Sequence, residues 1–152
     1  MPDADVSHGS ARISGDACSL VGGSLAAVSR ALSRQVDHAL NDLDLTADTC
    51  YLLDLIVQHD GIAMNDLARR LAIPAPTLTK LVDRLASKAL VFRLVDHTDR
   101  RRTLVHASLR GSEVHATASQ RAREIEARFM AELGWSDAQL NALQALNAPE
   151  DH

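Results

Sequence analysis

Two short helical segments and two β-prone segments follow one another without a long linker between Met64 and Ala107, and this order restricts the fold more than any other feature. Met64–Leu71 is predicted as a short helix, the turn Ala72-Ile73-Pro74 ends it, and Ala75–Lys88 is predicted as a second helix. Four apolar residues of the second helix occupy positions i, i+3, i+4 and i+7 and therefore share one buried face. They are Leu78, Leu81, Val82 and Leu85.

A β-hairpin with a charged tip is predicted directly after this helix pair. Val91–Val95 and Thr103–Ala107 are β-prone and bracket the polar run Asp96–Arg102. Helix, turn, amphipathic helix and hairpin in this order are the parts of a winged helix-turn-helix. In such a unit the second helix docks by its apolar face and presents a small or polar face to a major groove about 12 Å wide.

Longer helices are predicted on both sides of this unit. Apolar residues recur at three- and four-residue steps over residues 16–41, and Thr46 is a natural N-cap for a helix over residues 46–58. Ser108 can cap a helix that runs to about residue 133, and the capping-box sequence Ser136-Asp137-Ala138-Gln139 starts the last one. The predicted fold class is therefore mainly α with a small β-hairpin wing, with helices flanking the winged unit.

Composition excludes several other classes of protein. A chain of 152 residues with 46% apolar and only 3% aromatic residues fits one largely helical domain rather than a β-sandwich. No apolar run approaches the roughly 20 residues that span a bilayer, and the polar stretch Met1–Gly15 has no secretory h-region. Cys18 and Cys50 are too few for a disulfide framework. We therefore expect a cytoplasmic protein without a membrane partner.

The net charge of −4 hides a strong asymmetry along the chain. Residues 61–111 contain ten Lys and Arg against four Asp, a net charge of +6, whereas the remaining residues together carry −10. A basic centre in an acidic chain indicates a module that binds a polyanion, joined to a region that need not touch it. The basic centre coincides with the predicted winged unit.

The residues of this unit resemble the core signature of the MarR-type (multiple antibiotic resistance regulator) transcriptional regulators. The matching residues are Leu67-Ala68, Leu71, Ile73, Thr77, Thr79, Leu81-Val82-Asp83-Arg84-Leu85, Lys88, Leu90-Val91, Arg93, Asp96 and Asp99-Arg100-Arg101. Leu45-Thr46 upstream and Ser108 with Gly111 downstream also match, so the resemblance extends over roughly residues 16–147. It implies a triangular homodimer that binds double-stranded DNA at a near-palindromic operator.

The resemblance also implies which residues contact DNA. The helix Ala75–Lys88 is assigned to the major groove and Arg101 to the minor groove, with Asp99 orienting a wing arginine. The expected DNA-binding residues are Pro76, Thr77, Thr79, Lys80, Arg84, Arg93, Asp99, Arg100, Arg101 and Arg102. Asp83 is interpreted as an ion-pair partner of Arg84 or of a neighbour. Two departures from the family pattern stand out: Pro74-Ala75-Pro76 replaces polar residues, and Ala89 replaces the customary Gly.

The same resemblance divides the chain into functional regions. Residues 1–15 and 148–152 are expected to be tails, residues 16–45 and 109–147 the helical dimerisation region, and residues 46–108 the DNA-binding region. The expected dimerisation residues are Leu20, Leu25, Val28, Phe129, Leu133, Leu140 and Leu143. The expected function is that of a regulator, a repressor more often than an activator, whose DNA affinity responds to a small aromatic or phenolic effector.

Two other functions remain open at this point. Cys18 lies near the start of the first helix, where a lowered thiol pKa favours a redox switch. Alternatively, the winged unit is a protein–protein interaction module without a DNA role.

The histidines show no metal-ligand spacing, and neither a glycine-rich phosphate loop nor a Gly-x-Ser-x-Gly motif is present. We therefore expect no metal, no cofactor and no enzymatic activity.

Overall fold

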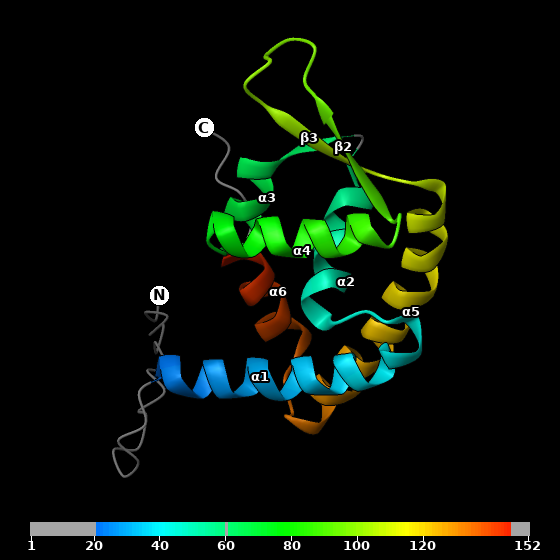
Figure 1. Ribbon diagram of the computed structural model, residues 1–152. Coiled ribbons are helices and arrows are strands. Elements are labelled where there is room, and N and C mark those ends of the chain that lie inside the picture. Colours follow the sequence, from blue (N-terminus) through cyan, green and yellow to red (C-terminus); the bar gives the residue numbers. More distant parts are fainter. Residues whose placement is uncertain (1–20, 60, 147–152) are drawn as a thin grey trace, which may run out of the picture.

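The computed structural model describes residues 21–59 and 61–146, and Figure 1 shows their arrangement. In chain order the elements are α1 (Val21–Ala39), the 3-10 helix η1 (Asn41–Leu43), α2 (Ala47–Val57), β1 (Ile62–Ala63), α3 (Met64–Leu71), α4 (Ala75–Ser87), β2 (Val91–Val95), β3 (Thr103–Ala107), α5 (Leu109–Glu132) and α6 (Asp137–Leu146). The helix pair α3–α4 and the hairpin β2–β3 confirm the predicted winged helix-turn-helix, and the fold is mainly α as expected.

Each predicted N-cap side chain forms its hydrogen bond. Thr46 and Thr49 form a reciprocal capping box at the start of α2, with the Thr46 backbone N–H donating to Thr49 Oγ1 over 2.8 Å. Ser108 Oγ accepts from the Gly111 N–H over 2.9 Å at the start of α5. The Ser136 N–H donates to Gln139 Oε1 over 2.8 Å before α6. These bonds satisfy backbone donors that have no partner inside a helix, which explains where the helices begin.

Helices α3 and α4 end in the same way, with an alanine in the left-handed conformation. Ala72 has φ 52° and Ala89 has φ 56°. After α4, the Ala89 N–H donates to Ala86 O over 2.9 Å and the Leu90 N–H to Leu85 O over 3.0 Å, the paired bonds of a Schellman motif. Ala89 thus performs the turn for which the family normally uses Gly, at the steric cost of a Cβ in this region.

The sheet contains one strand that the sequence analysis did not predict. Its order is β1-β3-β2, with all neighbours antiparallel, and Phe92 pairs with His106 across the hairpin. β1 pairs Ile62 with Val105 and Ala63 with Leu104. A strand of two residues is too short to give a period-two pattern, so only the folded chain reveals it.

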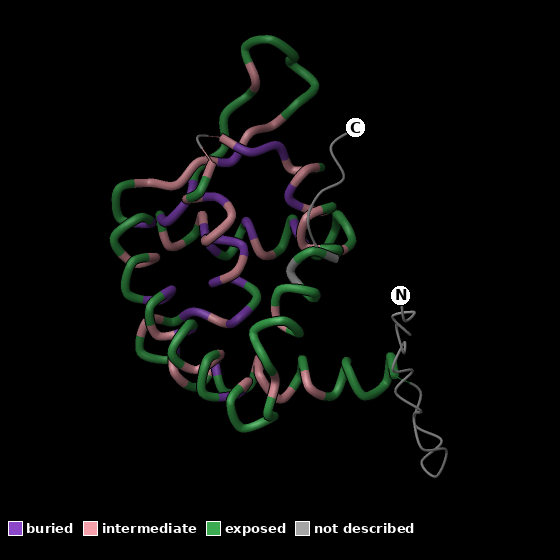
Figure 2. The backbone as a smooth tube through the Cα atoms, turned by 180° about the vertical axis from the view of Figure 1, so that it is seen from behind, coloured by how far each residue is buried: buried purple, intermediate pink, exposed green. Residues whose placement is uncertain are grey.

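The core lies between α2, the helix pair and the sheet, as the burial colours of Figure 2 show. Leu52, Leu53 and Ile56 of α2 are fully buried, and they belong to the same cluster as Leu78, Val82 and Leu85 of α4. Along α1, by contrast, Val36 alone is buried among the described residues, although the sequence predicted a continuous apolar stripe. No helix in the described segments is long and apolar enough to cross a bilayer.

Gly111 provides a test of how α5 packs against the end of α4. A Cβ at this position would overlap the backbone carbonyl oxygen of Leu90 and would lie 2.9 Å from its carbonyl carbon. Because backbone cannot give way cheaply, Gly111→Ala is expected to lower the free energy of unfolding by about 2–3 kcal/mol, as overpacking does. Urea denaturation followed by circular dichroism measures the change.

Gly23→Ala is the matched control for this substitution. Gly23 lies within α1, and a Cβ there meets nothing within 4 Å. The same methyl group should therefore raise helix stability by about 0.5–1 kcal/mol, because alanine has the higher helix propensity. Equal effects of the two substitutions would contradict the close contact at Leu90.

Candidate nucleic-acid interface

The outward face of α4 follows from the way its inward face is packed. Leu78, Val82 and Leu85 are buried, and a helix advances about 100° per residue, so the opposite arc must face solvent. Pro76 lies in the first turn, where its missing N–H costs no helical hydrogen bond. Thr79 on the outer arc donates to Ala75 O over 3.0 Å, whereas Lys80 forms no ion pair within the described segments. The outward face of α4 is therefore polar, and the ammonium group of Lys80 has no ion-pair partner among the described residues.

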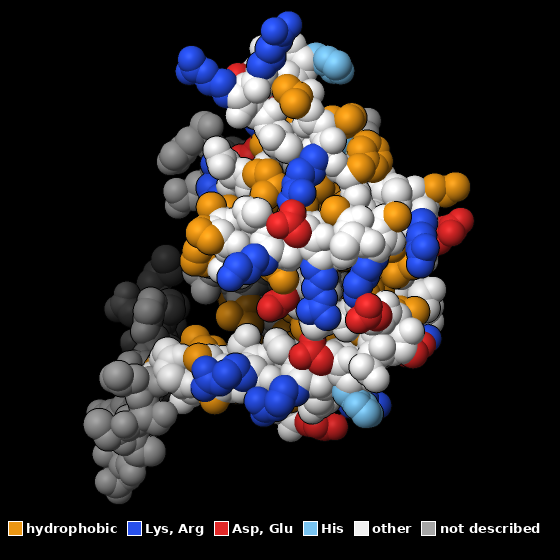
Figure 3. All heavy atoms as spheres, viewed as in Figure 1, with side chains coloured by type: hydrophobic (Ala, Val, Ile, Leu, Met, Phe, Trp, Pro, Cys, Tyr) orange, Lys and Arg blue, Asp and Glu red, His pale blue; other side chains and the backbone are white. Residues whose placement is uncertain are grey.

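All ten expected DNA-binding residues are exposed, as an interface with a duplex requires. They come from α4, from β2 and from the hairpin tip: Pro76, Thr77, Thr79, Lys80, Arg84, Arg93, Asp99, Arg100, Arg101 and Arg102. Figure 3 shows Lys and Arg side chains on α4 and on the hairpin tip over one face of the molecule. The fold thus brings together positively charged side chains from α4, from β2 and from the hairpin tip, which are separate segments of the sequence.

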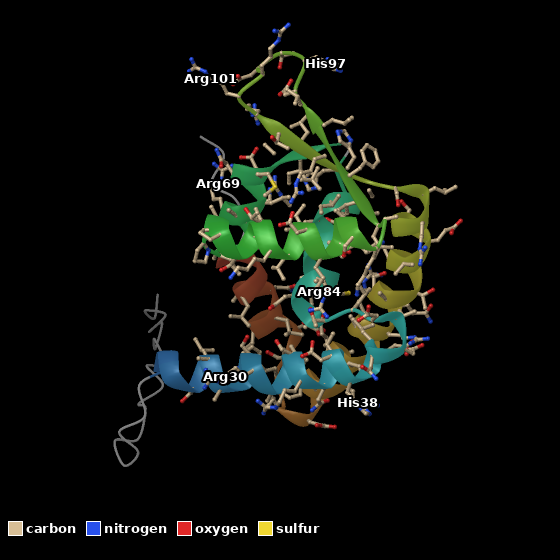
Figure 4. All side chains as sticks on the ribbon, viewed as in Figure 1. Arg30, His38, Arg69, Arg84, His97 and Arg101 are labelled. Atoms are coloured by element: carbon tan, nitrogen blue, oxygen red, sulfur yellow. The ribbon has the colours of Figure 1, made fainter. Side chains whose placement is uncertain are left out.

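The hairpin tip is held by short-range hydrogen bonds that two aspartate carboxylates accept. Asp96 Oδ1 accepts from the N–H and the hydroxyl of Thr98, at 2.8 and 2.7 Å, and these bonds lower the pKa of the Asp96 carboxyl. Asp99 Oδ1 accepts from the Arg101 backbone N–H over 3.0 Å. Asp99 therefore fixes the backbone of Arg101, while the guanidinium extends outward at the tip, as Figure 4 shows.

Acidic residues divide the basic side chains into two groups. Asp83 of α4 pairs with Arg93 of β2 over 2.7 Å, which ties the wing to the helix. Arg102 pairs with Asp66 over 3.3 Å. Arg100 and Arg101, by contrast, have no ion-pair partner in the part of the chain that the structure describes. The cations available to a ligand are therefore a subset of those that the sequence identified.

Sequence reasoning missed Asp66, which lies in the first turn of α3. Its two carboxylate oxygens contact Arg69 over 2.8 Å and Arg102 over 3.3 Å. A pocket of about 550 Å³ opens between this end of α3 and the hairpin, and Arg101 also lines it. The pair Asp66–Arg69 has helical i,i+3 spacing and was recognisable from sequence, but the contact with Arg102 spans 36 positions and was not.

The expected dimerisation residues differ in exposure. Leu25, Leu133 and Leu143 are 45%, 41% and 38% exposed in the single chain. Val28 and Leu140 are half-buried, whereas Phe129 is buried within the chain itself. Leu20 lies outside the described residues. The exposed leucines, on α1, on α6 and directly after α5, are large apolar side chains that one copy of the chain does not cover.

The cysteines occupy different parts of the chain. Cys18, the candidate residue for a thiol switch, lies outside the described residues. Cys50 of α2 is 2% exposed, and burial, with a smaller effect of the Asp54 and Glu126 carboxylates, raises its thiol pKa to about 11. The described segments contain no group of three or more His, Cys, Asp or Glu arranged to hold a metal ion.

The fold and the basic face together define a winged helix-turn-helix protein. Residues 43–102 match the family model described as MarR family. The HTH-type transcriptional regulator FarR of Neisseria gonorrhoeae is 26% identical over 99 residues, which cover 65% of this chain and 66%, just under two thirds, of FarR. The winged unit, residues 43–102, is therefore similar to the MarR family, and the curated relative that the chain matches is an HTH-type transcriptional regulator.

Two solved structures show how far the likeness in fold extends. The S. aureus MepR–DNA complex has a TM-score of 0.71 at 23% identity, over 84% of this chain and 93% of that one. CouR of Rhodococcus jostii RHA1, bound to p-coumaroyl-CoA, has a TM-score of 0.73 at 22% identity, over 88% of this chain and 95% of that one. The likeness therefore includes the helices on both sides of the winged unit.

Cys50 gives a chemical test of the packing of α2. Because its thiol pKa is raised to about 11, almost no thiolate forms at pH 7.5, and the buried sulfur is also inaccessible. In a Cys18→Ser variant, Ellman's reagent should leave the native protein unlabelled and should react with one thiol per chain after unfolding in urea. Rapid labelling of the native variant would mean that Cys50 is not buried.

Proposed function

We propose that this protein is a homodimeric, sequence-specific DNA-binding transcriptional regulator, acting as a repressor at a near-palindromic operator and responding to a small aromatic or phenolic effector. The observation that carries the proposal is a set of exposed cations on α4 and the hairpin tip that have no acidic partner among residues 21–59 and 61–146. They are Lys80, Arg100 and Arg101, within an otherwise acidic chain. Such a surface suits a polyanion and has no evident role in stabilising the fold.

The two basic elements suit two parts of a duplex. The outer arc of α4 carries small side chains beside Lys80, which allows the helix to enter a major groove about 12 Å wide. Asp99 holds the backbone of the hairpin tip in place, and the Arg101 side chain extends from this tip. A guanidinium group in this position suits the negative potential of a narrow minor groove. Pro76 and Ala75 begin the helix in place of polar residues, so apolar contact with a thymine methyl replaces some hydrogen bonds to bases.

Dimer formation is supported by the apolar side chains that the flanking helices leave exposed. Leu25 of α1, Leu133 directly after α5 and Leu143 of α6 all lie in the expected dimerisation region, 16–45 and 109–147. A two-fold interface would cover the same residues on both copies, and would present two α4 helices to half-sites about 34 Å apart. The similarity in fold to MepR, which was solved in complex with DNA, is consistent with this arrangement.

A pocket between α1 and α5 supports the effector part of the proposal. Its volume is about 410 Å³; Ala31 and Ile125 supply apolar lining, and Arg34, His38 and Arg128 supply groups that favour an anion. CouR was solved with p-coumaroyl-CoA, an aromatic acyl thioester. An effector bound between the dimerisation helices would alter the separation of the two α4 helices, and it acts only through its different affinities for the two spacings.

Lys80→Ala and Arg101→Ala test the DNA-binding function. Duplexes recovered from a random pool by selection against the purified dimer serve as the probe. Each substitution is expected to weaken binding about ten-fold at 150 mM salt. Because both protomers of the dimer carry the substitution, loss of one phosphate contact per protomer lowers the slope of log K against log salt by about 1.8. Fluorescence anisotropy over a salt series measures both quantities.

Arg30→Ala is the control for this experiment, because it removes the same charge from α1, well away from the hairpin tip in Figure 4. It should leave the affinity for DNA unchanged. A protein–protein interaction module predicts instead that Lys80→Ala and Arg101→Ala behave like the control. A protein that is monomeric and selects no duplex would contradict the proposed function.

The effector pocket is tested with aromatic carboxylates, p-coumarate among them, in a thermal-shift series. A ligand that binds only the folded state raises the melting temperature, and we expect at least one member to do so. Arg128→Ala should abolish the shift, because it removes one cation from the pocket lining. The expected site would be wrong if the shift persisted unchanged in this variant.

A further inference from the structure

We propose that Asp44 is a positioning residue that holds α4 in its DNA-reading orientation by joining the end of that helix to the turn between α1 and α2. The inference rests on the proposed function, because it assumes that α4 contacts the duplex. It concerns a residue that contributes nothing to the basic surface, since Asp44 carries the opposite charge. Its role is to act through Lys88.

The contact between Asp44 and α4 joins parts of the chain 44 residues apart. Asp44 Oδ2 lies 2.7 Å from Lys88 Nζ, and the same ammonium group donates to the backbone carbonyl oxygen of Asp44. Lys88 is the C-cap residue of α4. Arg84, one turn earlier on the helix, lies 3.9 Å from Asp44 Oδ1. Two successive turns of α4 are therefore linked to one residue.

The Lys88 side chain is held in place rather than extended into solvent. It is 20% exposed, whereas the side chain of Asp44 is 77% exposed. The hydrogen bond from Lys88, with the charge of the same group, lowers the pKa of the Asp44 carboxyl. Asp44 is thus ionised at neutral pH, and the ion pair is present under the conditions in which the protein would bind DNA.

The turn that carries Asp44 is itself attached to the expected dimerisation region. Asp42, two residues earlier, pairs with Arg121 of α5 over 2.6 Å, and Arg121 also donates to Ala39 O at the end of α1. Asp37 of α1 accepts from the Ala47 N–H over 2.6 Å at the start of α2. A shift of α1 or α5 would therefore move this turn, and Lys88 and Arg84 would carry the shift to α4.

Electrostatics and positioning predict opposite effects when Asp44 loses its charge. Removal of an acidic group close to a basic DNA-binding face should strengthen binding if only charge matters, because repulsion of the phosphates falls. Loss of the link should weaken binding instead, because α4 is no longer held in one orientation and ordering it costs free energy when the duplex binds. Whether the affinity for DNA rises or falls therefore distinguishes an electrostatic effect of Asp44 from a positioning role.

Asp44→Asn is the variant to test, because asparagine tolerates the left-handed backbone found at this residue, where φ is 52°. On the selected duplex we expect binding about three-fold weaker, in the range of one surface ion pair, with an unchanged salt slope. Asp48→Asn removes the same charge from an exposed position on α2 and should bind as tightly as the wild type, or more tightly. Circular dichroism and melting curves establish that both variants fold.

Lys88→Gln breaks the same link from the other side. If Lys88 acts through Asp44, it should weaken binding to the same extent, leave the salt slope unchanged, and add nothing to Asp44→Asn in the double variant. Equal or tighter binding by Asp44→Asn would overturn the inference. A Lys88→Gln effect that lowers the salt slope of the dimer by about 1.8 and adds to that of Asp44→Asn would also overturn it, since Lys88 of each protomer would then contact a phosphate.

The proposed function and this inference fail in different ways. If Lys80→Ala has no effect on DNA binding, α4 is not the reading helix and the function itself is wrong. If Lys80→Ala weakens binding while Asp44→Asn does not, the function stands and the positioning role of Asp44 is excluded.

Discussion

The burial of one face of α4 is the constraint on which the rest of this structure depends. Leu78, Val82 and Leu85 are almost completely removed from solvent, in a cluster shared with α2. Once these three positions are docked, helical geometry determines which side chains point outward, and the β-hairpin can follow only from the C-terminal end of the helix. The reading surface is therefore a consequence of hydrophobic packing on its opposite side.

The second determinant is the distribution of acidic residues within the basic unit. Asp83 binds Arg93, Asp66 binds Arg102, and Asp44 binds Lys88. Exposed ion pairs of this kind contribute little to the free energy of unfolding, so their main effect is to position the elements that they join. They join the wing, α3 and the α1–α2 turn to the helix pair, and they leave uncommitted cations at the surfaces that a duplex would approach.

The flanking helices offer a physical link between the proposed effector site and the proposed DNA-binding surface. α5 contacts both α1 and α2, and the short turn after α1 connects these helices to α4. A change in the relative position of α1 and α5 would therefore be passed to α4, the helix that we propose reads the duplex. The same two helices, α1 and α5, also line the pocket that we propose for the effector.

Local sequence signals were sufficient for most of the fold. The bounds of α2, α3, α4, β2, β3, α5 and α6 follow from caps, breakers and periodicity, all of which depend on neighbours a few residues away. The exposed, basic character of Lys80 and Arg101 was predictable for the same reason. The two-residue strand β1 was not, because its only signal is its pairing with β3.

Tertiary structure alone decided which charges meet. Asp83 pairs with Arg93 rather than with the adjacent Arg84, since the hairpin folds back onto α4. Lys88, the partner of Asp44, and Arg102, the second partner of Asp66, lie tens of residues away in the chain, and nothing in the local sequence identifies them. Periodicity records which face of a helix is buried, whereas the partner of a surface charge depends on how separate elements come together in space.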